Sequence, residues 1–261
     1  MRKLNRLHMG VMLAAIMLTG VRSAAAQAIE FPIHANDLKP GERIVTVVHA
    51  PGGGPQTGAK DLRILRRVAD NNWQVLKDGQ TNDAINSNYL IYGRPVYAMA
   101  GGTVVGCWRN APENSGHTKR PEIATGKILL QGNHIWIKQA DGNIALYAHA
   151  PTGDIPASLC PNNATFLTGT ALGGPIWTQP EATVANGAKV KPGQLLFHVG
   201  NSGNSSEPHL HVHLQDGPAL FAAAGLPAQF QDYLADGQPV ARGEPVKGQR
   251  IAPAPRTGAQ R

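Results

Sequence analysis

The sequence lacks an apolar run long enough to cross a bilayer as a helix. The apolar stretch at residues 9–21 falls well short of the roughly 20 residues that a span needs, and no other candidate follows it. Basic residues precede this stretch, and residues 23–26 end it with the A-x-A pattern of a signal-peptide cleavage site. We therefore predict that residues 1–26 are removed, which leaves an exported protein with no transmembrane segment.

Cysteine is scarce, which argues against a zinc site built from cysteine pairs. Cys107 and Cys160 are the only two in the sequence, and they do not have C-x-x-C spacing. In an exported protein an even pair favours a disulfide. We predict that Cys107 and Cys160 form one.

The body of the chain also lacks an excess of basic residues. The formal net charge is +7, but residues 1–26 hold four basic and no acidic side chains, and residues 242–261 hold five basic and one acidic. Without these two ends the net charge of residues 27–241 is near −1. Because no basic face is evident, nucleic-acid binding is not expected.

The abundant residues favour a β-rich domain with many turns. The chain has 30 Gly and 20 Pro, and Asp141-Gly142 between two apolar stretches is typical of a tight hairpin. One principal domain is expected over residues 27–241. Beyond it, large apolar residues are nearly missing, which predicts a disordered basic tail over residues 242–261. Strands are expected at residues 43–49, 61–68, 73–76, 92–106, 132–137, 144–149, 187–200 and 209–213, and long loops at 109–126 and 150–185. The strands within residues 187–200 are expected to pair with each other.

Three histidines at strict two-residue spacing follow a turn-rich run of Gly, Asn and Ser. On a strand, His209, His211 and His213 share one face, while Leu210 and Val212 pack behind it. Neighbouring imidazoles lie about 6.6 Å apart along such a strand, whereas the outer pair lies about 13 Å apart. One or two of these histidines can therefore be metal ligands, but three on a single ion are not expected.

The loop and strand together, S-G-x-S-x-x-P-H-L-H, resemble the signature of the lysostaphin and LytM-type zinc metallopeptidases, which are bacterial murein endopeptidases. Two further segments are similar to that family and occur in its order: G-x-P-V-x-A from Gly93, and G-N-x-I-x-I followed by Y-x-H ending at His149. The resemblance covers residues 89–217. It implies a mainly β fold, an antiparallel sheet or sandwich of the duplicated hybrid motif type, with long loops.

Site residues follow from the same resemblance. His211 corresponds to the zinc ligand of the H-x-H motif, while His209 and His149 correspond to the two catalytic histidines. His134 and His198 fall outside the motifs and are interpreted as structural or surface histidines.

The upstream part of the pattern departs from the family. The family takes two zinc ligands from H-x-x-x-D, and the best match here keeps Asp61 as a ligand but has Thr57 in the histidine position. Threonine is a poor zinc ligand. His49, twelve residues before Asp61, takes the place of the missing histidine if the intervening Gly-rich loop folds back. The loop around Asp83 is an alternative location for the motif, but it has no histidine either.

The resemblance implies a zinc endopeptidase that hydrolyses peptide bonds of peptidoglycan in the periplasm or outside the bacterial cell. The alternative is an inactive, metal-poor homologue that works as a cell-wall binding module or activates cell-wall amidases. A lipoyl-like carrier domain is a third class, which the lack of a lysine at a suitable hairpin tip counts against.

Overall fold

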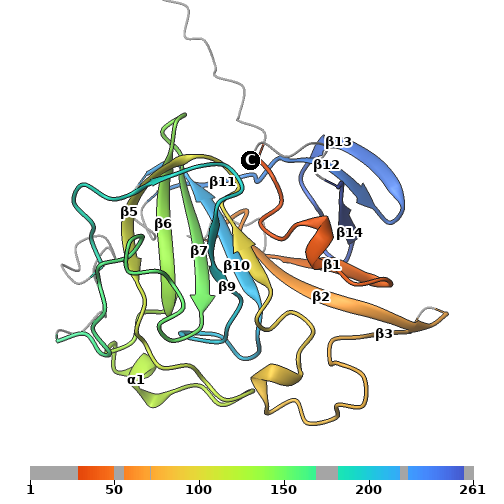
Figure 1. The fold of residues 1–261 in the computed structure, drawn as a ribbon, viewed down its shortest axis with the longest axis horizontal. Helices are drawn as coiled ribbons and strands as arrows, with labels where there is room; N and C mark the ends of the chain where they lie inside the picture. Colours follow the sequence, from red (N-terminus) through yellow and green to blue (C-terminus); the bar gives the residue numbers. More distant parts are fainter. Residues whose placement is uncertain (1–28, 50–55, 71, 169–181, 218–222, 256–261) are drawn as a thin grey trace, which may run out of the picture.

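The computed structural model describes residues 29–49, 56–70, 72–168, 182–217 and 223–255 (Figure 1). The predicted signal peptide lies outside these residues and stays a prediction. Within the described ranges, none of the helices reaches the length and apolarity that a membrane span requires.

Strands make up nearly all of the regular structure, as predicted for a mainly β fold. In the described part of the chain, the helical elements are one α-turn and two 3-10 turns: η1 (Ala35–Asp37), η2 (Asn86–Asn88) and α1 (Pro121–Ala124). The strands are β1 (Glu42–Val48), β2 (Lys60–Ala69), β3 (Asn72–Gln74), β4 (Pro95–Tyr97), β5 (Gly102–Trp108), β6 (Asn133–Gln139), β7 (Ile144–Ala150), β8 (Lys189–Val190), β9 (Leu195–His198), β10 (Leu210–Gln215), β11 (Gly225–Leu226), β12 (Phe230–Ala235), β13 (Gln238–Gly243) and β14 (Arg250–Pro253).

Most of these strands belong to one antiparallel sheet. Its order in the described part of the chain is β13-β12-β14-β1-β2-β10-β7-β6-β5-β8, with β3 paired to β2 and β11 paired to β10. Strands β4 and β9 form a separate pair. In Figure 1 the central strand β10 lies between β7 and β2, and so joins the two halves of the sheet.

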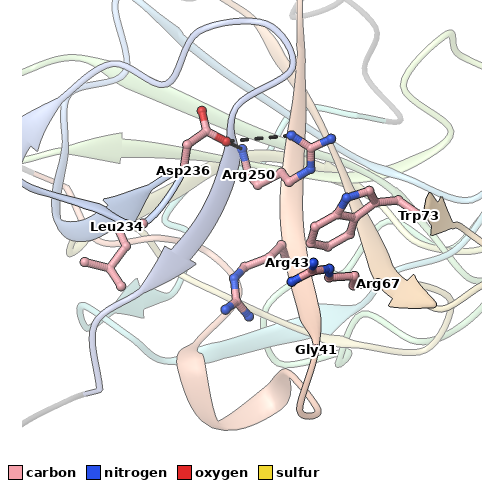
Figure 2. A pocket seen from close by; sticks show the side chains of 8 residues that line it. Gly41, Arg43, Arg67, Trp73, Leu234, Asp236 and Arg250 are labelled. Carbon is pink, nitrogen blue, oxygen red and sulfur yellow. Dashed lines mark hydrogen bonds and ion pairs between the residues drawn. The ribbon is translucent and has the colours of Figure 1, made fainter. Parts of the chain in front are cut away.

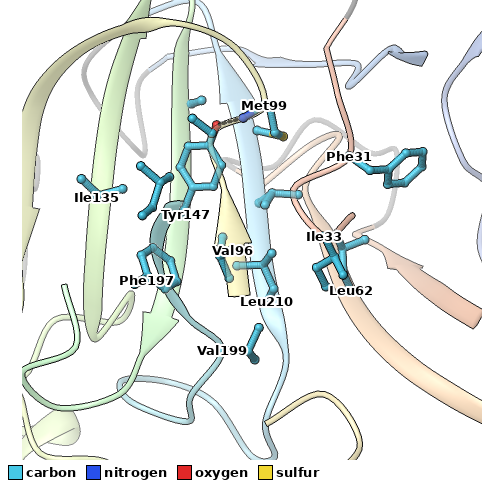
Figure 3. Packing of buried hydrophobic residues seen from close by; sticks show 14 of the residues in the cluster. Phe31, Ile33, Leu62, Val96, Met99, Ile135, Tyr147, Phe197, Val199 and Leu210 are labelled. Atoms are coloured by element: carbon cyan, nitrogen blue, oxygen red, sulfur yellow. Dashed lines mark hydrogen bonds between the residues drawn. The ribbon is translucent and has the colours of Figure 1, made fainter. Parts of the chain in front are cut away.

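The core lies against one face of the central strands. Leu62 and Leu210 are directly paired neighbours on β2 and β10, and both are fully buried. Figure 3 shows them with Val96 and Phe197 of the β4–β9 pair and with Tyr147 of β7. The Tyr147 hydroxyl accepts a hydrogen bond of 2.8 Å from the Met99 amide, so its polar end is satisfied within the core.

A second apolar cluster covers the opposite face of β5, β6 and β7, where Trp108, Trp136 and Leu146 pack together. Because both faces are covered, every residue of β7 is buried although the strand does not alternate polar and apolar residues. The same face continues across β10 and β2, where it is polar. It carries His211 and His213 of β10 and Asp61 of β2 in place of apolar residues.

Two sequence predictions need correction. The predicted disorder beyond residue 242 is wrong for β14, which pairs with β1 and β12, and its Ile251 is fully buried. This strand has few large apolar residues, but two partner strands supply its backbone hydrogen bonds. The strands within residues 187–200 do not pair with each other: β8 pairs with β5, and β9 with β4.

The predicted disulfide between Cys107 and Cys160 is present. It joins the end of β5 to the long loop after β7. That loop extends in part outside the described residues, at 169–181.

Candidate metal centre

Three adjacent strands bring the candidate ligands onto one face of the sheet. Asp61 on β2 is directly paired with Val47 on β1 and with His211 on β10. His49 lies two residues beyond Val47, so it points to the same face, and its amide continues the ladder to the Ala59 carbonyl at 3.1 Å. Residues paired directly or diagonally across strands are within side-chain reach, so the register itself assembles His49, Asp61 and His211.

The side chains meet closely. His49 Nε2 lies 3.0 Å from Asp61 Oδ2, and His211 Nδ1 lies 2.8 Å from Asp61 Oδ1. One donor atom from each of the three residues lies within 4.8 Å of the others, so the cluster could hold a metal ion. The side chain of His49 is 30% exposed, against 8% for His211, which leaves the cluster open to solvent on the β1 side.

The electrostatics favour an ionised carboxylate between the two imidazoles. Burial by itself would raise the pKa of Asp61, but hydrogen bonds to His211 and His49 and the nearby His209 together hold it well below its usual value. The hydrogen bond to Asp61 raises the pKa of His49. These are the donor types that zinc binds, namely imidazole nitrogen and carboxylate oxygen.

Two further histidines border the cluster. The rings of His149 and His209 are 4.6 Å apart between centroids, His149 is 5.9 Å from His211, and His209 Nε2 lies 3.6 Å from Asp61 Oδ1. Burial lowers the pKa of both His149 and His209, which favours their neutral forms.

Backbone carbonyls fix the tautomers of these two rings. His149 Nδ1 donates to the Ser202 carbonyl at 2.8 Å, and His209 Nδ1 donates to the Glu207 carbonyl at 2.9 Å. In a neutral imidazole the other nitrogen is then an acceptor, so Nε2 of each ring is available at the site. His149 also has a φ of 72°, a conformation that is uncommon for residues with side chains and is often found at functional sites.

The turn-rich loop before β10 is held tightly against β6 and β7. Ser202 Oγ donates to the Ala150 carbonyl at 2.7 Å and accepts from the Asn133 amide at 2.9 Å. Gly203 has a φ of 73°, and a Cβ at this position would lie 2.2 Å from the Gly132 nitrogen. The loop therefore needs glycine here to bring the Ser202 carbonyl to His149.

The remaining candidates lie elsewhere. Thr57 is not part of the ligand cluster. Asp83 pairs with His117 at 3.0 Å, but that pair is mostly exposed and on a loop. His134 on β6 is buried and donates from Nδ1 to the Gly132 carbonyl at 2.7 Å, and His198 pairs with Asp154 at 3.1 Å, so neither belongs to the ligand cluster.

The sequence offered His49 as one possible ligand, whereas the structure places it beside Asp61. The sequence did not predict that Ser202 and Glu207 orient His149 and His209. The signal for His49 was the pairing of residues 43–49 with the strand containing Asp61 across the Gly-rich loop. Ser202 and Glu207 act through their carbonyls, which no side-chain motif reveals. Glu207 is also held by Arg63 at 2.5 Å, which anchors the residue that orients His209.

An open His–Asp–His cluster with two buried histidines beside it defines a candidate metal site. A scan against models of protein families gives no match, and neither does a search of curated proteins.

A search of solved structures gives matches of low identity, and three of them are as follows. The catalytic domain of the prophage-encoded M23 protein EnpA from Enterococcus faecalis, in a mutant form, is 20% identical with a TM-score of 0.35, over 71% of this chain and 88% of that one. The catalytic domain of lysostaphin from Staphylococcus simulans is 18% identical with a TM-score of 0.33, over 73% and 90%. The deep-sea M23 metalloprotease pseudoalterin is 15% identical with a TM-score of 0.37, over 85% and 99%.

Proposed function

We propose that this protein is an exported zinc metallopeptidase that hydrolyses peptide bonds of bacterial peptidoglycan. The observation that carries the proposal is the meeting of His49, Asp61 and His211 on three adjacent strands, with His149 and His209 facing the same cluster. The motifs around His149 and His211, which resemble lysostaphin and LytM-type peptidases, supply the substrate class.

The donor set fits zinc. Two imidazoles and one carboxylate are a ligand combination of catalytic zinc sites, which keep a further position open, and this cluster is open beside the partly exposed His49. The chemistry that zinc supplies when bound is Lewis acidity toward water and a peptide carbonyl. The three side chains would hold the ion in place, and Asp61 contributes the negative charge of the set.

The two bordering histidines would handle protons. Each has its Nδ1–H committed to a backbone carbonyl and is kept neutral by burial, so Nε2 can accept a proton from the attacking water. After accepting it, the same nitrogen can donate to the leaving amine or to the developing oxyanion. Because their carbonyl partners lie on the loop before β10, the loop and the strand act as one unit.

The alternative, a metal-poor module that binds cell walls or activates amidases, predicts weak metal binding and no hydrolysis.

The test is metal analysis of the mature protein together with release of new amino groups from purified peptidoglycan. We expect one tightly bound zinc per chain, and loss of both zinc and hydrolysis in His211→Ala. Lys138→Gln, an exposed change on β6, is the control and should match the wild type. A wild-type protein without bound zinc and without hydrolysis would refute the proposal.

A further inference from the structure

A polar pocket, shown in Figure 2, is lined by residues that are not part of the metal centre. It has a volume of about 490 Å³ and is formed where β1, β2, β3 and β14 meet the end of β12 and the turn that follows. Its lining includes Arg43, Arg67, Arg250, Trp73, Leu234 and Asp236.

Positive charge exceeds negative charge in this pocket. The guanidinium of Arg43 donates to the Glu42 carbonyl at 2.6 Å, and no carboxylate in the described part of the chain lies within ion-pair distance of it. Arg67 pairs with Asp70, but both side chains are largely exposed, and such a pair contributes little. The Arg250 guanidinium lies 3.9 Å from Asp236 Oδ1, at the outer limit of an ion pair, and the Arg250 amide donates to the same oxygen at 3.0 Å. Three arginines therefore face one pocket with a single lining carboxylate.

The same pocket has an apolar wall. The Arg250 guanidinium lies 4.8 Å from the centre of the Trp73 ring, a cation–π arrangement that holds both side chains in place. Leu234, which is 42% exposed, lines the pocket too. Arginine forks match planar oxyanions, and the apolar wall suits a small apolar group attached to one.

The strand register places this pocket on the same face of the sheet as the metal centre. β1 and β2 pair without interruption from Glu42 opposite Arg66 to Val48 opposite Lys60, so alternate residues keep to one face. Arg43 therefore shares a face with His49, and Arg67 shares a face with Asp61. Trp73 joins that face because it is directly paired with Arg67.

Arg43 lies six residues from His49, and Arg67 lies six residues from Asp61. Six residues along a strand correspond to about 20 Å. An extended peptide of about six residues spans the same length. Between the two ends, Val45 and Leu65 are half-buried, and Arg63, which is paired with Glu207, lies beside them, so this part of the face is partly accessible.

We propose that the pocket binds a free carboxylate of a peptidoglycan peptide about 20 Å from the bond that the metal centre would cleave. The substrate assignment rests on the proposed function, whereas binding at the pocket does not require hydrolysis. The pocket would set which peptides are held across the sheet, by pairing their carboxylate with Arg43, Arg67 and Arg250.

Sedimentation of the full mature protein with insoluble peptidoglycan tests this, at 4 °C and over times that release no peptide. Three preparations serve as probes: untreated peptidoglycan, peptidoglycan stripped of phosphate polymers with hydrofluoric acid, and stripped peptidoglycan with its carboxylates converted to amides. The double variant Arg43→Gln/Arg67→Gln should bind the stripped material about tenfold more weakly than the wild type. Amidation of the stripped peptidoglycan should weaken binding of the wild type by a similar factor and leave binding of the double variant unchanged. Arg242→Gln, an exposed arginine on β13 outside the pocket, is the matched control and should behave as wild type.

Arg43→Lys/Arg67→Lys keeps the charges but loses the guanidinium forks, so it should bind more weakly than the wild type and more tightly than the glutamine variant, which separates recognition of charge from a folding defect. The proposal is overturned if the glutamine variant binds like the wild type, or if the lysine variant binds no better than the glutamine variant at equal thermal stability. It is also overturned if amidation of the peptidoglycan weakens binding of the glutamine variant as much as it weakens binding of the wild type. A third refuting result is that the wild type and the glutamine variant bind equally well once phosphate polymers have been stripped. Absence of hydrolysis by wild-type protein would refute the peptidase proposal and leave the pocket result to be judged by sedimentation.

Discussion

Replacing His49 by alanine removes one of the three donors that the sheet brings together. His49 Nε2 lies 3.0 Å from Asp61, whose other oxygen contacts His211, so the variant leaves one carboxylate and one imidazole at the centre. The change falls at the end of β1, on a side chain that is 30% exposed, so the core is not disturbed. The variant should therefore fold as the wild type does and bind zinc more weakly.

The size of the effect follows from the ligand count. Zinc sites with four protein ligands contribute about 10–16 kcal/mol, which corresponds to roughly 2.5–4 kcal/mol for each ligand. Loss of His49 should then weaken zinc binding on the order of 100- to 1,000-fold. Hydrolysis at limiting zinc should fall with it, and excess zinc should restore part of the activity.

Competition against a chromophoric chelator measures the zinc affinity directly. His117→Ala is the matched control, because His117 also pairs with an aspartate at 3.0 Å but on an exposed loop without a third ligand. It should leave the affinity unchanged. If His49→Ala keeps its zinc affinity within about threefold of the wild type while Asp61→Ala and His211→Ala lose it, His49 is not a ligand and the placement is refuted.

Three other predictions follow from the same structure. His149→Ala and His209→Ala should each abolish peptide release while keeping most of the zinc, measured by metal analysis of the purified variants; loss of metal equal to that of a ligand variant would show that their roles are misassigned. Reducing the Cys107–Cys160 disulfide, whose residues are 53 apart in sequence, should lower the free energy of unfolding by about 4 kcal/mol in urea titrations, and an unchanged midpoint would contradict it. Burial lowers the pKa of His134 from 6.5 to about 4, so the unfolded state binds the proton more readily than the folded state. The free energy of unfolding should therefore be highest above pH 6.5 and fall by up to about 3 kcal/mol as the pH drops toward 4. His134→Gln should flatten this part of the stability profile, and an unchanged slope would count against it.

Local patterns predicted the strands and one half of the site. The alternation around Leu210 and Val212 predicted His209, His211 and His213 on one strand; β10 carries His211 and His213, and His209 lies immediately before its first residue. The hairpin around Asp141-Gly142 was predicted from its turn residues, and β6 and β7 form it. These features depend on residues that are close in sequence, so their chemistry could be recognised without the fold.

The tail shows why other features could not be predicted. Arg250–Pro253 looked too polar and too short of large apolar residues to be ordered, yet β14 is held by β1 and β12. Its stability comes from hydrogen bonds to strands far away in the sequence. The same non-local pairing brings Arg250 to the pocket that contains Arg43 and Trp73.

The sequence by itself determined that the chain is β-rich, that Cys107 and Cys160 pair, and that His211 sits on a strand with His209 beside it. Only the tertiary structure decided which histidine meets Asp61 and His211, because Thr57 occupies the position where the motif expects histidine. His49 reaches Asp61 because β1 and β2 pair in a fixed antiparallel register, and Asp61 reaches His211 because β2 pairs with β10. Such cross-strand contacts depend on which strands become neighbours, and that choice is made by the packing of the whole sheet.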